Sequence, residues 1–136
     1  MGFRPQVSQD TKATVRSAAV LTTSYVAASV ELDLQNWNQL VLLLDFTKGA
    51  STGFTIKLEF SDKDRLDWFQ ETAIGSSTIA ANIATTPVYQ NEYTFSETGK
   101  YALPVPVNYR YVRISSKALT AAGGTVLAIY ATQGLV

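Results

Sequence analysis

The chain has 136 residues, 46% of them hydrophobic, and contains neither cysteine nor histidine. This composition excludes disulfides, cysteine-ligated metals, thiolate nucleophiles, Ser-His-Asp triads and imidazole bases. Lysine plus arginine equals aspartate plus glutamate at 11 each, so we expect no nucleic-acid or membrane partner. Because the catalytic side chains cysteine and histidine are missing, we expect a binding protein, not an enzyme, and no cofactor.

The first eleven residues are mostly polar and precede the first strand pattern. Phe3, Pro5 and Val7 are their apolar anchors, and Arg4 lies between the first two. Such a segment is either a frayed terminus or an arm that extends onto a neighbouring subunit. We assign 1–11 as an N-terminal arm, followed by a single domain.

Alternation of apolar and polar residues with a period of two predicts half-buried strands in the domain, 12–136. The clearest example is 53–61, and 26–34 shows the same pattern upstream. Between them, 39–47 carries five consecutive apolar residues, which predicts a strand with both faces covered. Such a strand either runs through the centre of the sheet or has its outer face closed by a neighbouring segment or subunit. A glycine-containing turn joins 39–47 to 53–61 and predicts a hairpin over 39–61.

Further short strand patterns occupy the rest of the domain at regular spacing. They lie at 12–20, 68–72, 88–95, 100–105, 108–117 and 125–133. In total we expect about eight strands and no long helix. Many short strands joined by glycine-containing turns are typical of an all-β, antiparallel sandwich, and we expect a jelly-roll-like one.

An uncharged segment at 75–87 interrupts the strand rhythm. It carries Ile79 and Ile83 among small residues. Loops of this length are uncommon in compact domains and often carry function, although a packed Ω-type loop or a short helical turn is an equal alternative. Because the segment has no charge, it suits a protein contact better than a catalytic site.

The acidic turn after 53–61 contains Asp62, Asp64 and Asp67 and is the best candidate for metal chemistry. Oxygen-rich loops bind calcium, but this turn lacks the glycine and terminal glutamate of a complete calcium loop. Lys63 and Arg65 lie between the acids and oppose the charge that would attract a cation. We therefore expect a solvated, salt-bridged turn and no metal.

The segment 108–117 contains Tyr109, Tyr111 and Arg113 at alternate positions. On a strand these side chains share one face, so they form either an amphipathic binding patch or ordinary packing in which the arginine covers the rings. The patch would suit a glycan or a protein.

Five runs of framework residues resemble small virion proteins of tailed bacteriophages. The runs are LDL at 32–34, LVLLLDFTKG at 40–49, IKLEFSD at 56–62, GKYALP at 99–104 and YVRI at 111–114. The likeness extends from about Leu32 to Tyr130 and transfers no catalytic residue. Part of the last run also recurs in carbohydrate-binding and discoidin-like jelly rolls.

The resemblance implies a capsid decoration or cement protein, made in the bacterial cytoplasm and located on the virion. Its expected partners are the major capsid protein and other copies of the chain. We expect the contacts at the arm (Phe3, Arg4, Pro5, Val7), the uncharged loop (Ile79, Ile83) and the strand patch (Tyr109, Tyr111, Arg113). The alternatives are a tail or baseplate protein with a structural or receptor-binding role, and a carbohydrate-binding module.

Overall fold

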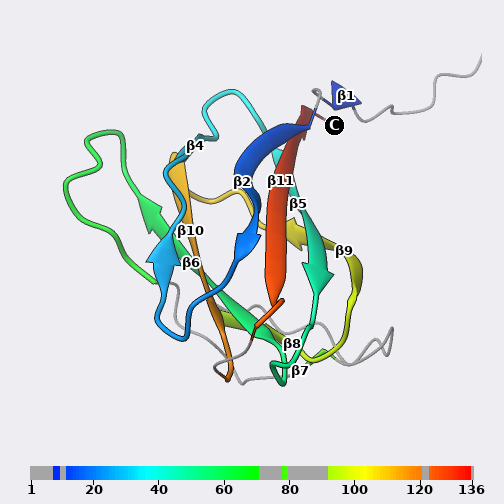
Figure 1. The fold of residues 1–136 in the computed structure, drawn as a ribbon. Coiled ribbons are helices and arrows are strands. Elements are labelled where there is room, and N and C mark those ends of the chain that lie inside the picture. The colour runs from blue at the N-terminus through cyan, green and yellow to red at the C-terminus, as the bar shows by residue number, and fades with distance from the viewer. Residues whose placement is uncertain (1–7, 10–11, 71–77, 80–91, 121–122, 136) are drawn as a thin grey trace, which may run out of the picture.

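The structure, a computed structural model, describes residues 8–9, 12–70, 78–79, 92–120 and 123–135. These residues form eleven strands in two sheets that enclose one core, and no helix occurs among them (Figure 1). The predicted all-β, antiparallel sandwich is confirmed. Within the same residues, no helix has the length and apolar character that crossing a membrane requires.

Sheet A is wholly antiparallel and has the order β1-β11-β5-β9, with β2 also paired to β11. Its strands are β1 (Ser8–Gln9), β2 (Ala13–Val20), β5 (Gln39–Thr47), β9 (Gly99–Val105) and β11 (Val126–Leu135). Strand β5 is interior and β9 is an edge. Two residues of the predicted arm, Ser8 and Gln9, pair with the end of β11, so this part of 1–11 is joined to the sheet.

Sheet B has the order β3-β10-β6-β8-β7, with β4 also paired to β10. Its strands are β3 (Val26–Ala27), β4 (Leu32–Asp33), β6 (Phe54–Ser61), β7 (Thr78–Ile79), β8 (Glu92–Phe95) and β10 (Tyr111–Ala118). Only the pairing of β7 with β8 is parallel among the described strands.

The single strand predicted at 26–34 is wrong, because β3 and β4 are separate pieces at one edge. Ala27 pairs with Ser115 and Leu32 pairs with Val112. The chain therefore advances five residues in this segment while β10 advances three. The extra residues bulge outward, which leaves Val30 38% exposed whereas Leu32 is buried.

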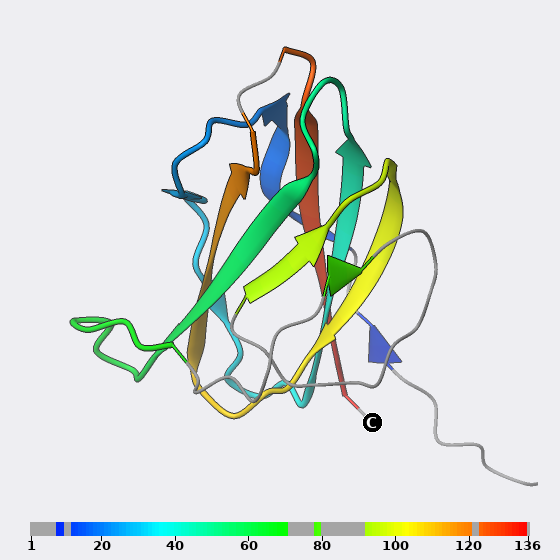
Figure 2. The same cartoon turned by 90° about the horizontal axis from the view of Figure 1, so that it is seen from below.

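The hairpin predicted over 39–61 is also wrong, although both of its strands are correct. Strand β5 pairs with β11 and β9, whereas β6 pairs with β10 and β8. The turn between them therefore carries the chain from sheet A to sheet B (Figure 2). Both strands direct large side chains into the shared core, and the Phe46 and Phe54 ring centroids are 4.2 Å apart.

Two glycines allow this crossover turn to close. Gly49 and Gly53 have φ values of 57° and 148°, which L-residues rarely adopt. The buried Ser51 hydroxyl donates to the Gly53 carbonyl at 2.8 Å and accepts from the Thr120 amide at 3.3 Å, so it ties the turn to the end of β10.

The core lies between the sheets and is built from the inward side chains of β5, β6, β10 and β11. Its largest members include Phe46, Phe54 and Phe95, and the Phe54 and Phe95 rings stack at 4.8 Å. The predicted strands at 12–20, 100–105, 108–117 and 125–133 correspond to β2, β9, β10 and β11. At 68–72, the described part shows only a bridge between Phe69 and Phe60.

Candidate interaction surface

The outer face of sheet B carries ionic side chains that pair with one another and cover aromatic rings. Arg113 on β10 lies opposite Glu59 on β6, and its Nη2 donates to Glu59 Oε1 at 3.0 Å. The guanidinium also lies 4.6 Å from the Trp68 ring centroid. Both groups of the ion pair are largely shielded, so this contact holds two strands and the following loop together.

A second ring on this face, Tyr25, is flanked by Lys57 and Lys117. Their Nζ atoms lie 4.7 Å and 4.6 Å from its ring centroid. Burial, followed by the charge of Glu92 and a side-chain hydrogen bond to it, raises the Tyr25 pKa to about 12. The phenol therefore stays protonated through the physiological range. Its contacts with Lys57, Lys117 and Glu92 link side chains of three strands on this face.

The predicted grouping of Tyr109, Tyr111 and Arg113 is correct for the last two residues only. Tyr111 and Arg113 share the outer face of β10, and Arg65 and Arg110 lie 4.8 Å and 5.2 Å from the Tyr111 ring centroid. Tyr109 precedes the strand, and its ring packs 4.7 Å from the ring of the core residue Phe60. A sugar-stacking platform needs free ring faces, and cations already cover Tyr111 and Trp68.

The loop after β6 projects from the sandwich and is held in one shape by its own hydrogen bonds (Figures 1 and 2). The Phe60 and Phe69 backbones exchange hydrogen bonds of 2.7 Å and 2.9 Å where the loop closes. Inside it, Ser61 Oγ donates to the Asp67 carbonyl at 2.8 Å. Arg65, at a φ of 54°, reaches back to Glu31 at 3.8 Å.

One carboxylate of this loop, that of Asp62, stabilises the shape of the loop. Asp62 Oδ1 accepts a hydrogen bond of 3.0 Å from the Asp64 amide. Within the described residues, no group of three acidic side chains is placed to hold a metal ion.

Exposed apolar side chains gather on and beside this loop. Leu66 is 83% exposed and Phe69 is 65% exposed. Tyr109, at 41% exposure, joins Phe69 in lining a depression of about 440 Å³ at the base of the loop. We call Leu66, Phe69 and Tyr109 the tip patch. A rigid loop that presents apolar groups to water is a natural protein contact.

Only Tyr109 of the tip patch was anticipated from the sequence. Leu66 stands alone among charged residues, and Phe69 fell within the strand predicted at 68–72. One signal in the sequence could have indicated this contact. Leu66 is apolar and lies at the centre of a charged turn, where solvation alone would favour a polar residue.

A second apolar surface lies on the outer face of sheet A, where β11, β5 and β9 run side by side. Leu43 on β5 lies between Tyr130 on β11 and Ala102 on β9, and Val41 lies opposite Pro104. We call these five residues the outer stripe; Ala102 and Pro104 are exposed, and the other three are partly buried. The inward neighbours in β5 are fully buried, so the predicted double-faced strand has one core face and one accessible apolar face.

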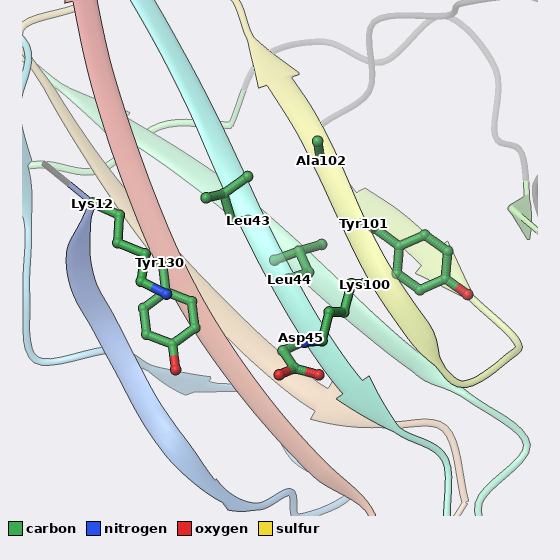
Figure 3. A pocket seen from close by; sticks show the side chains of 8 residues that line it. All are labelled: Lys12, Leu43, Leu44, Asp45, Lys100, Tyr101, Ala102 and Tyr130. Atoms are coloured by element: carbon green, nitrogen blue, oxygen red, sulfur yellow. The ribbon is translucent and has the colours of Figure 1, made fainter. Parts of the chain in front are cut away.

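Charged side chains border the outer stripe (Figure 3). Asp45 and Lys100, both exposed, are cross-strand partners at one end. On the β11 side, Lys12 Nζ lies 4.2 Å from the Tyr130 ring centroid. Between these borders the surface dips into a depression of about 280 Å³, to which the stripe contributes Leu43, Ala102 and Tyr130.

The remaining predicted contact residues are not tested by the structure. Phe3, Arg4, Pro5, Val7 and Ile83 lie outside the described residues. Ile79 belongs to β7, whose backbone pairs with β8 opposite Phe95.

No protein family model and no curated protein matches the chain. Among solved structures, the chain is similar to the SPBc2 prophage-derived protein YomS, with a TM-score of 0.61 and 13% sequence identity. The alignment covers 98% of this chain and 99% of YomS. At this identity the likeness supports the fold, and it shows that the whole sandwich is shared.

Proposed function

We propose that the chain is a non-enzymatic structural protein of a tailed bacteriophage particle, and that it decorates the capsid by binding the major capsid protein. Two observations support a phage protein: the framework runs in the sequence, and a fold shared end to end with a prophage-derived protein. The tip patch carries the proposed contact, because it combines exposed apolar groups with a loop that is already ordered before binding.

The size of the tip patch fits a contact that is weak in one copy. Burying its three exposed side chains contributes on the order of 5 kcal/mol from apolar area. Loss of translational and rotational freedom offsets much of this gain. Binding to a lattice therefore becomes stable where an assembly engages two or more sites together.

The proposal is tested by adding the purified chain to expanded heads of the phage that encodes it and measuring co-sedimentation. The double variant Leu66→Ser/Phe69→Ser should bind at least tenfold more weakly. Val26→Ser is the matched control, because Val26 is 57% exposed on β3 and lies outside the tip patch. Unchanged thermal unfolding of both variants would show that the loss concerns binding. Equal binding by the double variant would refute the tip contact.

Immunogold labelling of complete particles shows whether the protein is located on the capsid or on the tail or baseplate. The decoration proposal requires label over the head. Label confined to the tail would overturn the capsid assignment and favour a tail protein with the same fold.

The arm and the uncharged loop remain predicted lattice contacts. Deleting 1–7 and shortening 80–87 should each weaken head binding and reduce the resistance of the heads to heat. If both deletions leave binding and heat resistance unchanged, the two contact predictions are wrong. The tip contact is tested separately, by the variant Leu66→Ser/Phe69→Ser.

A further inference from the structure

The loop after β6 carries more negative than positive charge where it projects, although the chain as a whole is neutral. Its central part holds three carboxylates, two cations and one apolar side chain, all exposed: Asp62, Asp64, Asp67, Lys63, Arg65 and Leu66. The contacts of each side chain decide which of these charges is available to a partner.

Arg65 directs its charge back toward sheet B. Its guanidinium lies 4.8 Å from the Tyr111 ring centroid, and its Nη1 lies 3.8 Å from Glu31 Oε1. The positive charge is therefore matched by a carboxylate outside the loop and by a ring of β10. Of the cations in the loop, only Lys63 is left to oppose its acids.

Two carboxylates in the same turn as Leu66 are without partners. Among the residues that the structure describes, the carboxylates of Asp64 and Asp67 make no ion pair and accept no hydrogen bond. Burial of Leu66 against a partner excludes water from this turn, and a charge close to such a contact interacts more strongly than one in bulk water. The tip is therefore suited to a partner that brings both apolar surface and positive charge.

We propose that this loop recognises a partner segment in which a bulky apolar side chain stands beside lysine or arginine. The inference rests on the proposed function, because it specifies the chemistry of the partner at the tip patch. The apolar side chain of the partner enters the depression of about 440 Å³ that Phe69 and Tyr109 line. The cation of the partner lies against Asp64 and Asp67.

The depression suits one large apolar side chain. The rings of Phe60, Phe69 and Tyr109 line it, and such rings favour an aromatic or aliphatic occupant. Its volume lies within the range of about 300–1,000 Å³ that is usual for sites that hold small ligands. The backbone hydrogen bonds between Phe60 and Phe69 fix the base of the loop before binding, so little conformational entropy is lost when the partner enters.

Cations that line the depression do not reverse this preference. Lys63 and Arg110 both line it. Arg110 is already paired with Asp33, with 3.3 Å between Nε and Oδ1, so it offers little free charge to an acidic ligand. Lys63 is outnumbered by the carboxylates of its own loop. An acidic segment would therefore be repelled at the tip, whereas a basic segment is attracted.

Neutralising the two free carboxylates tests the charge preference on expanded heads. Asp64→Asn/Asp67→Asn should bind at least about fivefold more weakly than wild type near 50 mM salt, and this difference should shrink near 500 mM, where screening is strong. The matched control is Asp45→Asn/Glu97→Gln, which removes the same charge from exposed positions outside the loop and should bind as wild type. Both double variants should unfold at the temperature of wild type.

Two short peptides test the same chemistry without the capsid. The isotope-labelled chain is titrated, with detection by NMR, with acetyl-Lys-Leu-Phe-Lys-amide and with acetyl-Glu-Leu-Phe-Glu-amide, which differ only in charge. The basic peptide should shift the amide resonances of 61–70 and 108–110 with a dissociation constant on the order of 1 mM, and the acidic peptide should bind at least about tenfold more weakly. Asp64→Asn/Asp67→Asn should lose this discrimination.

The outcomes separate this inference from the proposed function. Head binding that depends on Leu66 and Phe69, but neither on salt nor on the two carboxylates, would refute the basic partner and leave the capsid contact in place. Wild type that prefers the basic peptide at the tip, yet does not bind heads, would support the basic partner and refute the capsid contact. Equal binding of the two peptides, preference for the acidic one, or no shift at 61–70 would overturn the inference.

Discussion

Gly53, where the chain enters sheet B, is the position at which the crossover is most sensitive to substitution. Its φ of 148° is rarely adopted by residues with a side chain. A Cβ placed there would lie 2.2 Å from the Phe95 carbonyl oxygen and 3.1 Å from the Ser96 Cα. Both neighbours are backbone atoms, so Gly53→Ala must move the end of β8 away from β6.

The cost of Gly53→Ala has two parts. Holding alanine at this φ costs about 1–3 kcal/mol. Displacing the packed backbone of β8 costs about 1–3 kcal/mol more. Taking about 4 kcal/mol together, and an unfolding entropy of about 290 cal/mol/K for 136 residues, Tm should fall by about 14 °C.

Differential scanning calorimetry of wild type and Gly53→Ala measures this shift. Gly123→Ala is the matched control, because a Cβ at Gly123 meets nothing within 4 Å. The control should unfold within about 3 °C of wild type. If Gly53→Ala were as stable as Gly123→Ala, the crossover turn would not have the tight approach to β8 on which this reasoning rests.

Two further substitutions test the outer face of sheet B. Tyr25→Phe removes the hydroxyl whose pKa is raised to about 12. Because the pKa is raised in the folded state, the contribution of the protonated hydroxyl to the free energy of unfolding is complete below pH 10 and is lost as the pH rises toward 12. In urea denaturation, wild type should therefore lose more stability than Tyr25→Phe between about pH 8 and pH 11. Equal losses would contradict the assignment. Arg113→Lys keeps the charge but loses the guanidinium contact with the Trp68 ring, and should cost about 1 kcal/mol in the same assay. An unchanged midpoint would show that this contact contributes nothing.

Local pattern was sufficient to place most of the long strands. Residues 39–47 and 54–61 form strands because their large side chains alternate about a buried face, and this information is contained in each segment. The local pattern does not indicate which strand pairs with which, because hydrogen bonds between backbones are nearly independent of sequence. The turn at 48–53 therefore looked like a hairpin, although it connects two sheets.

The surfaces were harder to anticipate than the strands. The apolar run in β5 indicated a second covered face, but whether a loop or another molecule covers Val41 and Leu43 depends on contacts distant in sequence. The cations over Tyr111 and Trp68 come from the loop after β6 and from β10, and no local pattern brings them together. Leu66 and Phe69 are recognisable only once the loop is seen to project.

The most direct test of the central claim is a cryo-electron microscopy map of the phage particle at side-chain resolution. Copies of this sandwich should lie on the outside of the capsid, with Leu66 and Phe69 buried against the major capsid protein. A capsid without the sandwich, or one on which these two side chains face solvent, would contradict it.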